Sequence, residues 1–497
     1  MALIPAWLGN APNGSWVKAN LTTKDEAIAE LDACATSASA NSIERVWEAF
    51  AGSAWDPVHK RLWVFGGGHA VTTFNAPIAI DVGSAGDRAW HILHYHTRTL
   101  RNEDFDNVPN SGPPMRVTAD YQFNYQGPPV SAHAYDNNKY LAVADRFITF
   151  GGAQSGDGSW WRRYVDENGE PTFDPDTGSV TDAPRTGPFL YDYERRDPSR
   201  LGGHAGTAVE PSGCDNSGVQ GAEAWSNPDW MDALPAWSSP DRSTVVRVEN
   251  GRDVIYHSRT SLQRIEIDTS GAVISMNSAG SFLQGHTGMH VAEIIDVGDR
   301  RAFVQFTGRH PSSSGLISHL LKYWDITDFP TTYGSQVVNA ADVHISSQHY
   351  THADGDRPDW PDGPHASEEG SNPGMAWDTY RRKLVLWNGS KRLYELIPPQ
   401  TLATTGWELA DYVTDPLAAD GQFPVNPVVS GRTRFVLGHF HYDRGWDVYL
   451  GLEKNSTNLW LFKPQDWSPS AGNDEGRRVW APSVDRVGDR LWETTLE

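Results

Sequence analysis

The stretch AWDPVHKRLWVFGGGH at residues 54–69 decides the fold class. Apolar residues on both sides of a polar turn at 56–60 predict two short strands, the second of which ends in glycines. The segments NAPIAIDV at 75–82 and AWHIL at 89–93 predict two further strands. Four short strands in succession indicate one small antiparallel sheet.

This four-stranded pattern recurs along the chain. The six copies that we recognise occupy residues 54–93, 133–193, 243–268, 289–326, 374–409 and 434–464. Radial repetition of small sheets is typical of a β-propeller. We therefore predict an all-β fold, a propeller of six or seven four-stranded blades over 43–464. The interval 195–240 leaves room for the seventh blade.

The two ends of the chain differ from the repeats. Thr23, followed by Glu26, is typical of a helix N-cap, and the apolar spacing after it predicts a short helix over 22–38. From residue 465 the chain is an irregular polar tail with three spaced tryptophans. We predict an N-terminal segment at 1–42 that acts as an anchor, the propeller at 43–464, and a tail at 465–497 that docks on the propeller or on a partner.

The composition restricts the partners. The chain of 497 residues has 41 Lys and Arg against 63 Asp and Glu, a net charge of −22, which repels polyphosphate backbones, so no nucleic-acid partner is predicted. No apolar run is long enough for membrane insertion. The N-terminus lacks the pattern of a secretory signal. We expect a virion-surface or extracellular location reached by another route, with the cytoplasm as the alternative.

The two cysteines, Cys34 and Cys214, cannot supply a disulfide framework, and the sequence leaves open whether they are bonded to each other.

Several of the repeated motifs resemble those of a known family. The motifs are FGGGH at 65–69, SAHAYD at 131–136, GMAWDTYRRKLVLW at 374–387, FHYDRGWDVYL at 440–450 and NLWLFKP at 458–464. Together they resemble kelch-type, galactose-oxidase-like β-propellers, and more narrowly the kelch-like propellers found in bacteria and bacteriophages. The resemblance covers about 50–463 and implies the fold. Nothing resembles the Tyr-Cys crosslink of the copper oxidase, and propellers serve unrelated functions.

The topology of a blade predicts where functional side chains gather. The loop between the second and third strands and the loop into the next first strand leave the sheet at the same face. We therefore predict that polar residues in these loops converge on one mouth of the central channel. If the protein is an enzyme, the catalytic candidates are His69, His133, Tyr135 and Arg309. The ligand-binding candidates are Gln154, Trp160, His257, His286, His290, His310, Asn388, Glu368 and His439.

These residue types suit carbohydrate. Imidazole, guanidinium and amide groups bond sugar hydroxyls or a uronate carboxylate, and aromatic faces stack on pyranose rings. A structural interpretation stands beside each candidate: His69 and His133 can close turns or satisfy buried carbonyls, and His257, Arg309 and His310 can be ordinary loop residues. No cofactor is predicted. A solvated loop is preferred for 349–356, although its histidines and aspartates leave calcium or zinc open.

Three functions are compatible with these features. The leading hypothesis is a phage-type virion or tail-associated propeller that recognises a host surface polysaccharide, with other tail proteins as further partners. The first alternative is a polysaccharide-degrading enzyme, either a β-eliminating lyase or a hydrolase, acting as a depolymerase. The second alternative is an intracellular protein-interaction propeller. The sequence does not identify the glycan or the oligomeric state.

Overall fold

The computed structural model describes the chain between residues 4 and 469 in separate stretches. These are 4–22, 26, 46–47, 51–67, 77–93, 134–150, 188–193, 225–226, 243–258, 261–281, 291–306, 321–329, 341–342, 374–387, 389, 391, 393–411, 417–418, 422–424, 436, 438–453 and 457–469. Within them the fold is almost entirely β, and no helix is long and apolar enough to cross a membrane.

The strands of the described stretches form six small sheets, numbered here I to VI, in which neighbouring strands are antiparallel except for one pair. Sheet I contains β2 (Ala51–Asp56), β3 (Arg61–Gly66), β4 (Ile78–Asp81) and β5 (Trp90–Ile92). Sheet II contains β6 (Asn138–Leu141), β7 (Arg146–Thr149), β8 (Phe189–Tyr191) and β9 (Trp225–Ser226). Sheet III contains β10 (Thr244–Glu249), β11 (Arg252–Ser258), β12 (Ser261–Ile267) and β13 (Val273–Ser281).

The remaining sheets follow the same order. Sheet IV contains β14 (Val291–Val297), β15 (Arg300–Phe306), β16 (Leu321–Asp325) and β17 (Ala341–Asp342). Sheet V contains β18 (Gly374–Asp378), β19 (Lys383–Trp387), β20 (Leu393–Ile397) and β21 (Glu408–Asp411). Sheet VI has the order β22-β1-β25-β24-β23, with β23 (Phe440–Asp443), β24 (Val448–Leu452), β25 (Leu459–Lys463), β1 (Ser15–Lys18) and β22 (Leu417–Ala418). Each of the six repeats in the sequence therefore corresponds to one sheet.

Sheet VI joins the two ends of the chain. Strand β1 pairs antiparallel with β25 and parallel with β22. Trp16 of β1 is fully buried, and its indole N–H donates to the Lys391 carbonyl oxygen at 2.8 Å. The division that we predicted at residue 43 is therefore not a boundary of the fold, because an N-terminal strand completes the last sheet.

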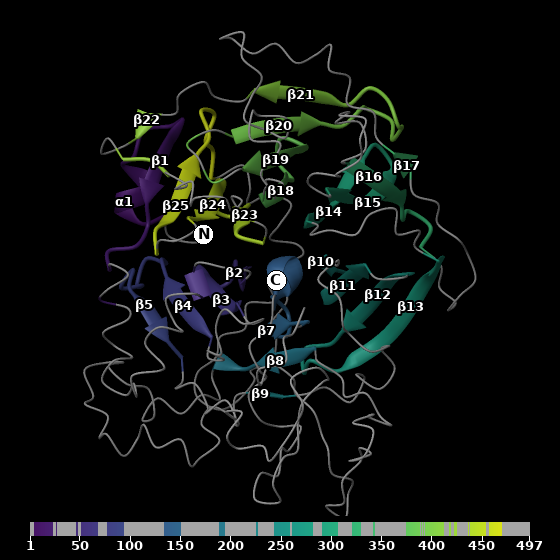
Figure 1. Ribbon diagram of the computed structural model, residues 1–497, viewed down its shortest axis with the longest axis horizontal. Coiled ribbons are helices and arrows are strands. Elements are labelled where there is room, and N and C mark those ends of the chain that lie inside the picture. The colour runs from purple at the N-terminus through teal and green to yellow at the C-terminus, as the bar shows by residue number, and fades with distance from the viewer. Residues whose placement is uncertain are drawn as a thin grey trace, which may run out of the picture.

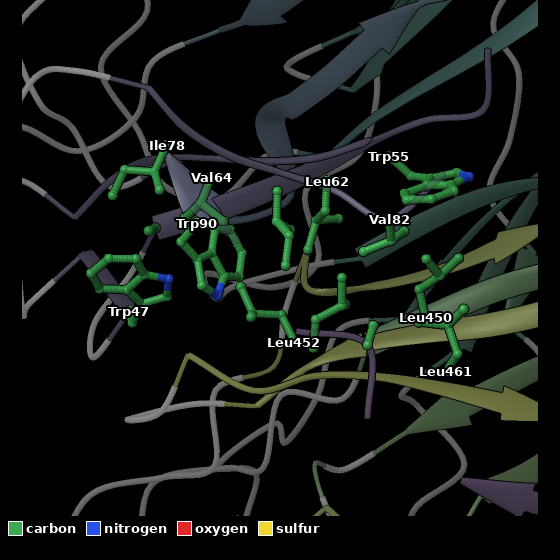
Figure 2. Close-up of a cluster of buried hydrophobic side chains, with 14 of the residues drawn as sticks. Trp47, Trp55, Leu62, Val64, Ile78, Val82, Trp90, Leu450, Leu452 and Leu461 are labelled. Carbon is green, nitrogen blue, oxygen red and sulfur yellow. The ribbon is translucent and has the colours of Figure 1, made fainter. Parts of the chain in front are cut away.

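The sheets close into a ring. The first strands of successive sheets contact one another from β2 through β6, β10, β14 and β18 to β23, and β23 contacts β2. Figure 1 shows the sheets arranged around a common centre. An apolar cluster lies between each pair of neighbouring sheets. The cluster between sheets I and VI includes Trp55, Leu62 and Leu450 (Figure 2).

The hairpins between first and second strands have a local cause. In three sheets the first strand ends in an aspartate, at Asp56, Asp378 or Asp443, whose Oδ1 accepts backbone N–H groups of the turn. The residue before the second strand then takes a left-handed conformation, as at Lys60, with φ of 61°. An aspartate that bonds the turn backbone favours such tight connections.

The same aspartates join neighbouring sheets. Asp443 Oδ2 accepts from the Trp55 indole N–H and from Lys60 Nζ, both of sheet I and both at 2.7 Å. Arg381 of sheet V forms two bonds, of 2.7 and 2.8 Å, to the carboxylate of Asp447 in sheet VI. Because these groups are almost completely buried, the ring is held by paired charges as well as by apolar packing.

Segments near both ends of the described part of the chain contact sheet VI. The short helix α1 (Ala6–Gly9) and the turn after it present carbonyl oxygens to the buried Lys463, whose Nζ lies 3.3 Å from Gly9 O and 2.5 Å from Ala11 O. Lys463 Nζ also lies 3.7 Å from the ring centre of Trp467, whose indole N–H donates to Trp446 O. The start of the C-terminal tail thus docks on the ring. Apart from residues 22 and 26, the predicted helix over 22–38 lies outside the described residues.

Candidate functional site at the axis of the ring

Polar side chains gather where the first strands line the inside of the ring. We define the axial cluster as Ser53 of β2, Asp136, Lys139 of β6, Glu293 of β14 and His441 of β23. Asp136 belongs to η2 (Tyr135–Asn137), the 3₁₀ turn immediately before β6. The blue segment that carries η2 and β6 lies at the centre of the ring in Figure 1. Residues far apart in the sequence therefore share one environment.

An ion pair stands at the centre of this cluster. Lys139 Nζ lies 2.5 Å from Asp136 Oδ1, and the backbone N–H of Ala292 donates to Asp136 Oδ2 at 3.1 Å. Burial raises the pKa of Asp136, and the charge of Lys139 opposes that rise. Since Ala292 belongs to β14, Asp136 links sheet II to sheet IV across the ring.

Glu293 has the most perturbed carboxyl group of the cluster. Burial raises its pKa to about 8; Lys139 opposes the rise, and the negative charge of Asp136 adds to it. Arg247 and the Trp377 backbone N–H also favour the ionised form, but more weakly. Glu293 therefore carries a proton at neutral pH, so its side chain can donate a hydrogen bond.

Ser53 and His441 form a contact whose direction can be worked out. Ser53 Oγ lies 2.7 Å from Gly438 O and 2.8 Å from His441 Nε2. A carbonyl oxygen only accepts, so the single hydroxyl proton goes to Gly438, and His441 Nε2–H donates to Oγ. A histidine that donates to the serine cannot remove its proton. This pair therefore does not have the hydrogen bonding of an activated serine nucleophile.

His441 is neutral in this setting. Burial holds the pKa of His441 well below its usual value, and the charges of Lys139 and His439 lower it further. With Nε2 protonated, Nδ1 is the acceptor nitrogen. The axial cluster consequently combines the Asp136–Lys139 contact with a carboxyl group whose pKa burial raises to about 8 and an imidazole whose pKa burial lowers.

The turn η2 fills the centre of the ring. Tyr135 has a φ of 44°, which is rare for a bulky residue. A Cβ atom at Gly52 or at Gly438 would overlap the Tyr135 carbonyl oxygen, so both glycines are needed for the close approach. Asn137 Oδ1 accepts from the Thr244 hydroxyl at 3.0 Å. Through these contacts and that of Asp136, a single turn touches sheets I, III and IV and the segment before β23.

Three of the predicted site residues lie in the described part of the chain, and all three are buried. The Tyr135 side chain is 5% exposed and packs in the apolar cluster between sheets IV and V, so it has no free face for a sugar ring. His257 was predicted in a loop but lies within β11, where it bonds the Thr244 hydroxyl at 2.8 Å and stacks on Phe150. His439 bonds Ala51 O at 2.9 Å through Nε2. All three side chains therefore bond or pack within the ring of sheets.

The other predicted site residues lie outside the described part of the chain. They are His69, His133, Gln154, Trp160, His286, His290, Arg309, His310, Glu368 and Asn388. The histidines and aspartates of 349–356 and both cysteines also lie outside it. Within the described stretches, no group of three or more His, Cys, Asp or Glu side chains could hold a metal ion.

Sequence reasoning identified none of the five residues of the axial cluster. It named only two residues close to it, Tyr135 and His439. A signal was present in VAEIIDV at 291–297, where Glu293 interrupts a predicted strand that is otherwise apolar up to Asp296. A charged residue in the middle of a first strand indicates a side chain that faces the axis, because the other positions pack against neighbouring sheets. His441 in FHYD is likewise a polar residue inside a first strand, β23.

The comparisons with known proteins add little. No protein-family model matches the sequence, and a search of curated proteins finds no match. One similar solved structure is described as "Engineering the active site of a GH43 glycoside hydrolase generates a biotechnologically significant enzyme that displays both endo- xylanase and exo-arabinofuranosidase activity". Its TM-score is 0.29 and its identity 10%, over 74% of this chain and 53% of that chain. This chain therefore spans about half the length of the glycoside hydrolase.

A second similar structure is described as "Crystal structure of an ACO/RPE65 chimera". Its TM-score is 0.29 and its identity 10%, over 73% of this chain and 68% of that chain. At these scores neither similarity bears on the activity of the protein.

Proposed function

We propose that the six sheets are the blades of a six-bladed β-propeller that binds a host surface polysaccharide as part of a virion or tail. One observation indicates which face of the ring binds the ligand. Connections between second and third strands, and connections into first strands, all begin and end at the same face of the ring. We call this the long-connection face.

The lengths of the connections distinguish the two faces. At the long-connection face the chain runs through 93–134, 150–188, 307–320 and 343–373 between strands. At the opposite face, first and second strands are joined by turns of two or four residues, such as 250–251 and 57–60. Two long connections, 192–224 and 326–340, belong to the opposite face. Loops on a rigid scaffold are the usual carriers of binding residues.

The sequence of these connections supports a carbohydrate ligand. They contain His69, Trp160, Arg309, His310 and Glu368, which combine hydrogen-bonding groups with an aromatic face. The burial of Tyr135 and the direction of the Ser53–His441 bond favour binding over catalysis by these groups. The assignment to a virion rests on the sequence resemblance alone.

Glycan binding by the full chain tests this proposal. We expect binding to a surface polysaccharide on a glycan array, and loss of at least tenfold in affinity in the variants Trp160→Ala and Arg309→Ala. Val58→Ser is the matched control, because Val58 lies in a turn of the opposite face and is 52% exposed. Equal loss in the control, or unchanged binding in both loop variants, would contradict the proposed face.

A polysaccharide-degrading enzyme is the second candidate, favoured by Glu293. Its partly exposed carboxyl group, whose pKa burial raises to about 8, lies near a second carboxyl group, that of Asp136, and glycoside hydrolysis uses two carboxyl groups, one of them with a raised pKa. Incubation with the bound polysaccharide distinguishes the two kinds of enzyme. Both release new reducing ends, but only a lyase also gives unsaturated products that absorb in the near ultraviolet, so reducing ends without that absorbance indicate a hydrolase. Binding without products, in the wild type and in Glu293→Gln, excludes this function.

A further inference from the structure

Strand β13 differs from the outermost strands of the other sheets. It has nine residues, Val273–Ser281, whereas β5, β9, β17, β21 and β22 have two to four. Within the described stretches β13 pairs only with β12, on one of its two edges. Figure 1 shows β13 at the outer rim of the ring. A long outer strand offers backbone N–H and C=O groups to another strand.

The charge around β13 is also unusual. No Asp, Glu, Lys or Arg occurs from residue 269 to residue 292, although such residues make up 21% of a chain with a net charge of −22. Monomeric proteins commonly protect an edge strand with lysine, proline or β-bulges, and β13 contains neither lysine nor proline. The neutral strand is therefore a place where two strongly acidic molecules can approach each other.

The pairing of β13 with β12 contains two register shifts. Glu266 pairs with Ser275 and Ile267 with Val273, so Ile274 is the extra residue of a bulge. A second shift, between the partners of Ser261 and Leu262, leaves out Gly280. The bulges limit the regular part of the edge to 275–279, about the length of an ordinary strand. Ile274 is 44% exposed, so this bulge presents an apolar side chain instead of a protecting charge.

We propose that the β13 edge pairs antiparallel with β13 of a second copy of this chain, forming a two-fold dimer with one continuous sheet of eight strands. Antiparallel pairing of identical strands is isologous, so one edge supplies both sides of the contact. The absence of charge removes local repulsion between two molecules that each carry −22. Main-chain hydrogen bonds hold the pair, and Ile274 adds apolar contact. This proposal is independent of the glycan-binding function.

Sedimentation velocity of the full chain between about 1 and 100 µM tests the dimer, since interfaces of this kind commonly have dissociation constants in or below that range. We expect a dimer for the wild type. Asn277→Lys, at the centre of the 275–279 edge, brings like charges together at the two-fold axis, and Ile274→Lys replaces the exposed apolar contact by a charge. Each should raise the dissociation constant at least tenfold. Val58→Lys is the control, because it introduces the same charge at another exposed apolar residue, away from β13. It should leave the dimer intact.

Circular dichroism of each variant confirms that the fold is retained, and two lysine positions guard against failure of one variant to fold. A monomeric wild type at the highest concentration overturns the proposal, as does a dimer that both lysine variants leave unchanged. Hydrogen exchange adds a further outcome. Slow exchange of the amides of 275–279 in a monomer would mean that another part of the same chain covers the edge, which also overturns it.

Discussion

Replacing Glu293 by glutamine should make the protein less sensitive to alkaline pH. The folded state holds the pKa of Glu293 at about 8, against 4.5 for an ordinary glutamate, because burial disfavours the charged form. The unfolded chain therefore loses this proton at lower pH than the folded protein does. Stability from this group is complete below pH 4.5 and decreases as the pH rises through 8.

The size of the effect follows from the difference in pKa. A tenfold change in proton affinity corresponds to about 1.4 kcal/mol, so ionisation of Glu293 costs the folded state at most about 4 to 5 kcal/mol. About 2 to 3 kcal/mol of this is lost between pH 6 and pH 9. Solvent that reaches the partly exposed side chain reduces the value, so these figures are upper bounds.

Urea unfolding followed by tryptophan fluorescence at pH 6, 7.5 and 9 measures the effect. The free energy of unfolding of Glu293→Gln, relative to wild type, should rise between pH 6 and pH 9 by up to the amount above. Glu408→Gln is the matched control, because Glu408, in β21, is an exposed glutamate. Parallel curves for wild type and Glu293→Gln across this range would refute the assignment of a raised pKa to Glu293.

Three further changes test the packing of the ring by urea unfolding. In Gly438→Ala the new Cβ overlaps the carbonyl oxygen of η2, so we expect a loss of at least about 2 kcal/mol, against about 1 kcal/mol or less for Gly9→Ala, where the nearest atom is 3.6 Å away; equal losses would contradict this. Trp16→Ala should cost about 3 to 5 kcal/mol, since β1 closes the ring, and a loss below 1 kcal/mol would show that sheet VI forms without it. Asp443→Ala should cost about 3 to 5 kcal/mol because it leaves Lys60 buried and unpaired, and adding Lys60→Met should restore part of the loss; additive losses would argue against the pair.

The sheets could be predicted from the sequence because their cause is local. An aspartate that bonds the turn backbone, a left-handed residue and a run of apolar residues lie within about a dozen positions of one another. The aspartate turn occurs in three sheets, and the wider four-stranded pattern recurs six times in the sequence, matching the six sheets in the described part of the chain. Nothing beyond a short window is needed to recognise a hairpin such as 51–66.

The surroundings of individual side chains could not be predicted in this way. His257 and Tyr135 were expected in polar surroundings, and both are buried by residues of neighbouring sheets. Whether a side chain faces the axis or packs between sheets depends on how one sheet is rotated against the next. A sequence window that covers a single sheet does not contain that information.

The repeated hairpins, the acidic surface charge and the uncharged stretch around β13 thus follow from short-range order in the chain. Completion of sheet VI by β1 and the meeting of Asp136 and Lys139 with Glu293 and His441 were decided by tertiary structure alone. The physical reason is that these contacts join distant parts of the sequence, and the low-dielectric centre that changes the proton affinities exists only once the six sheets have closed around it.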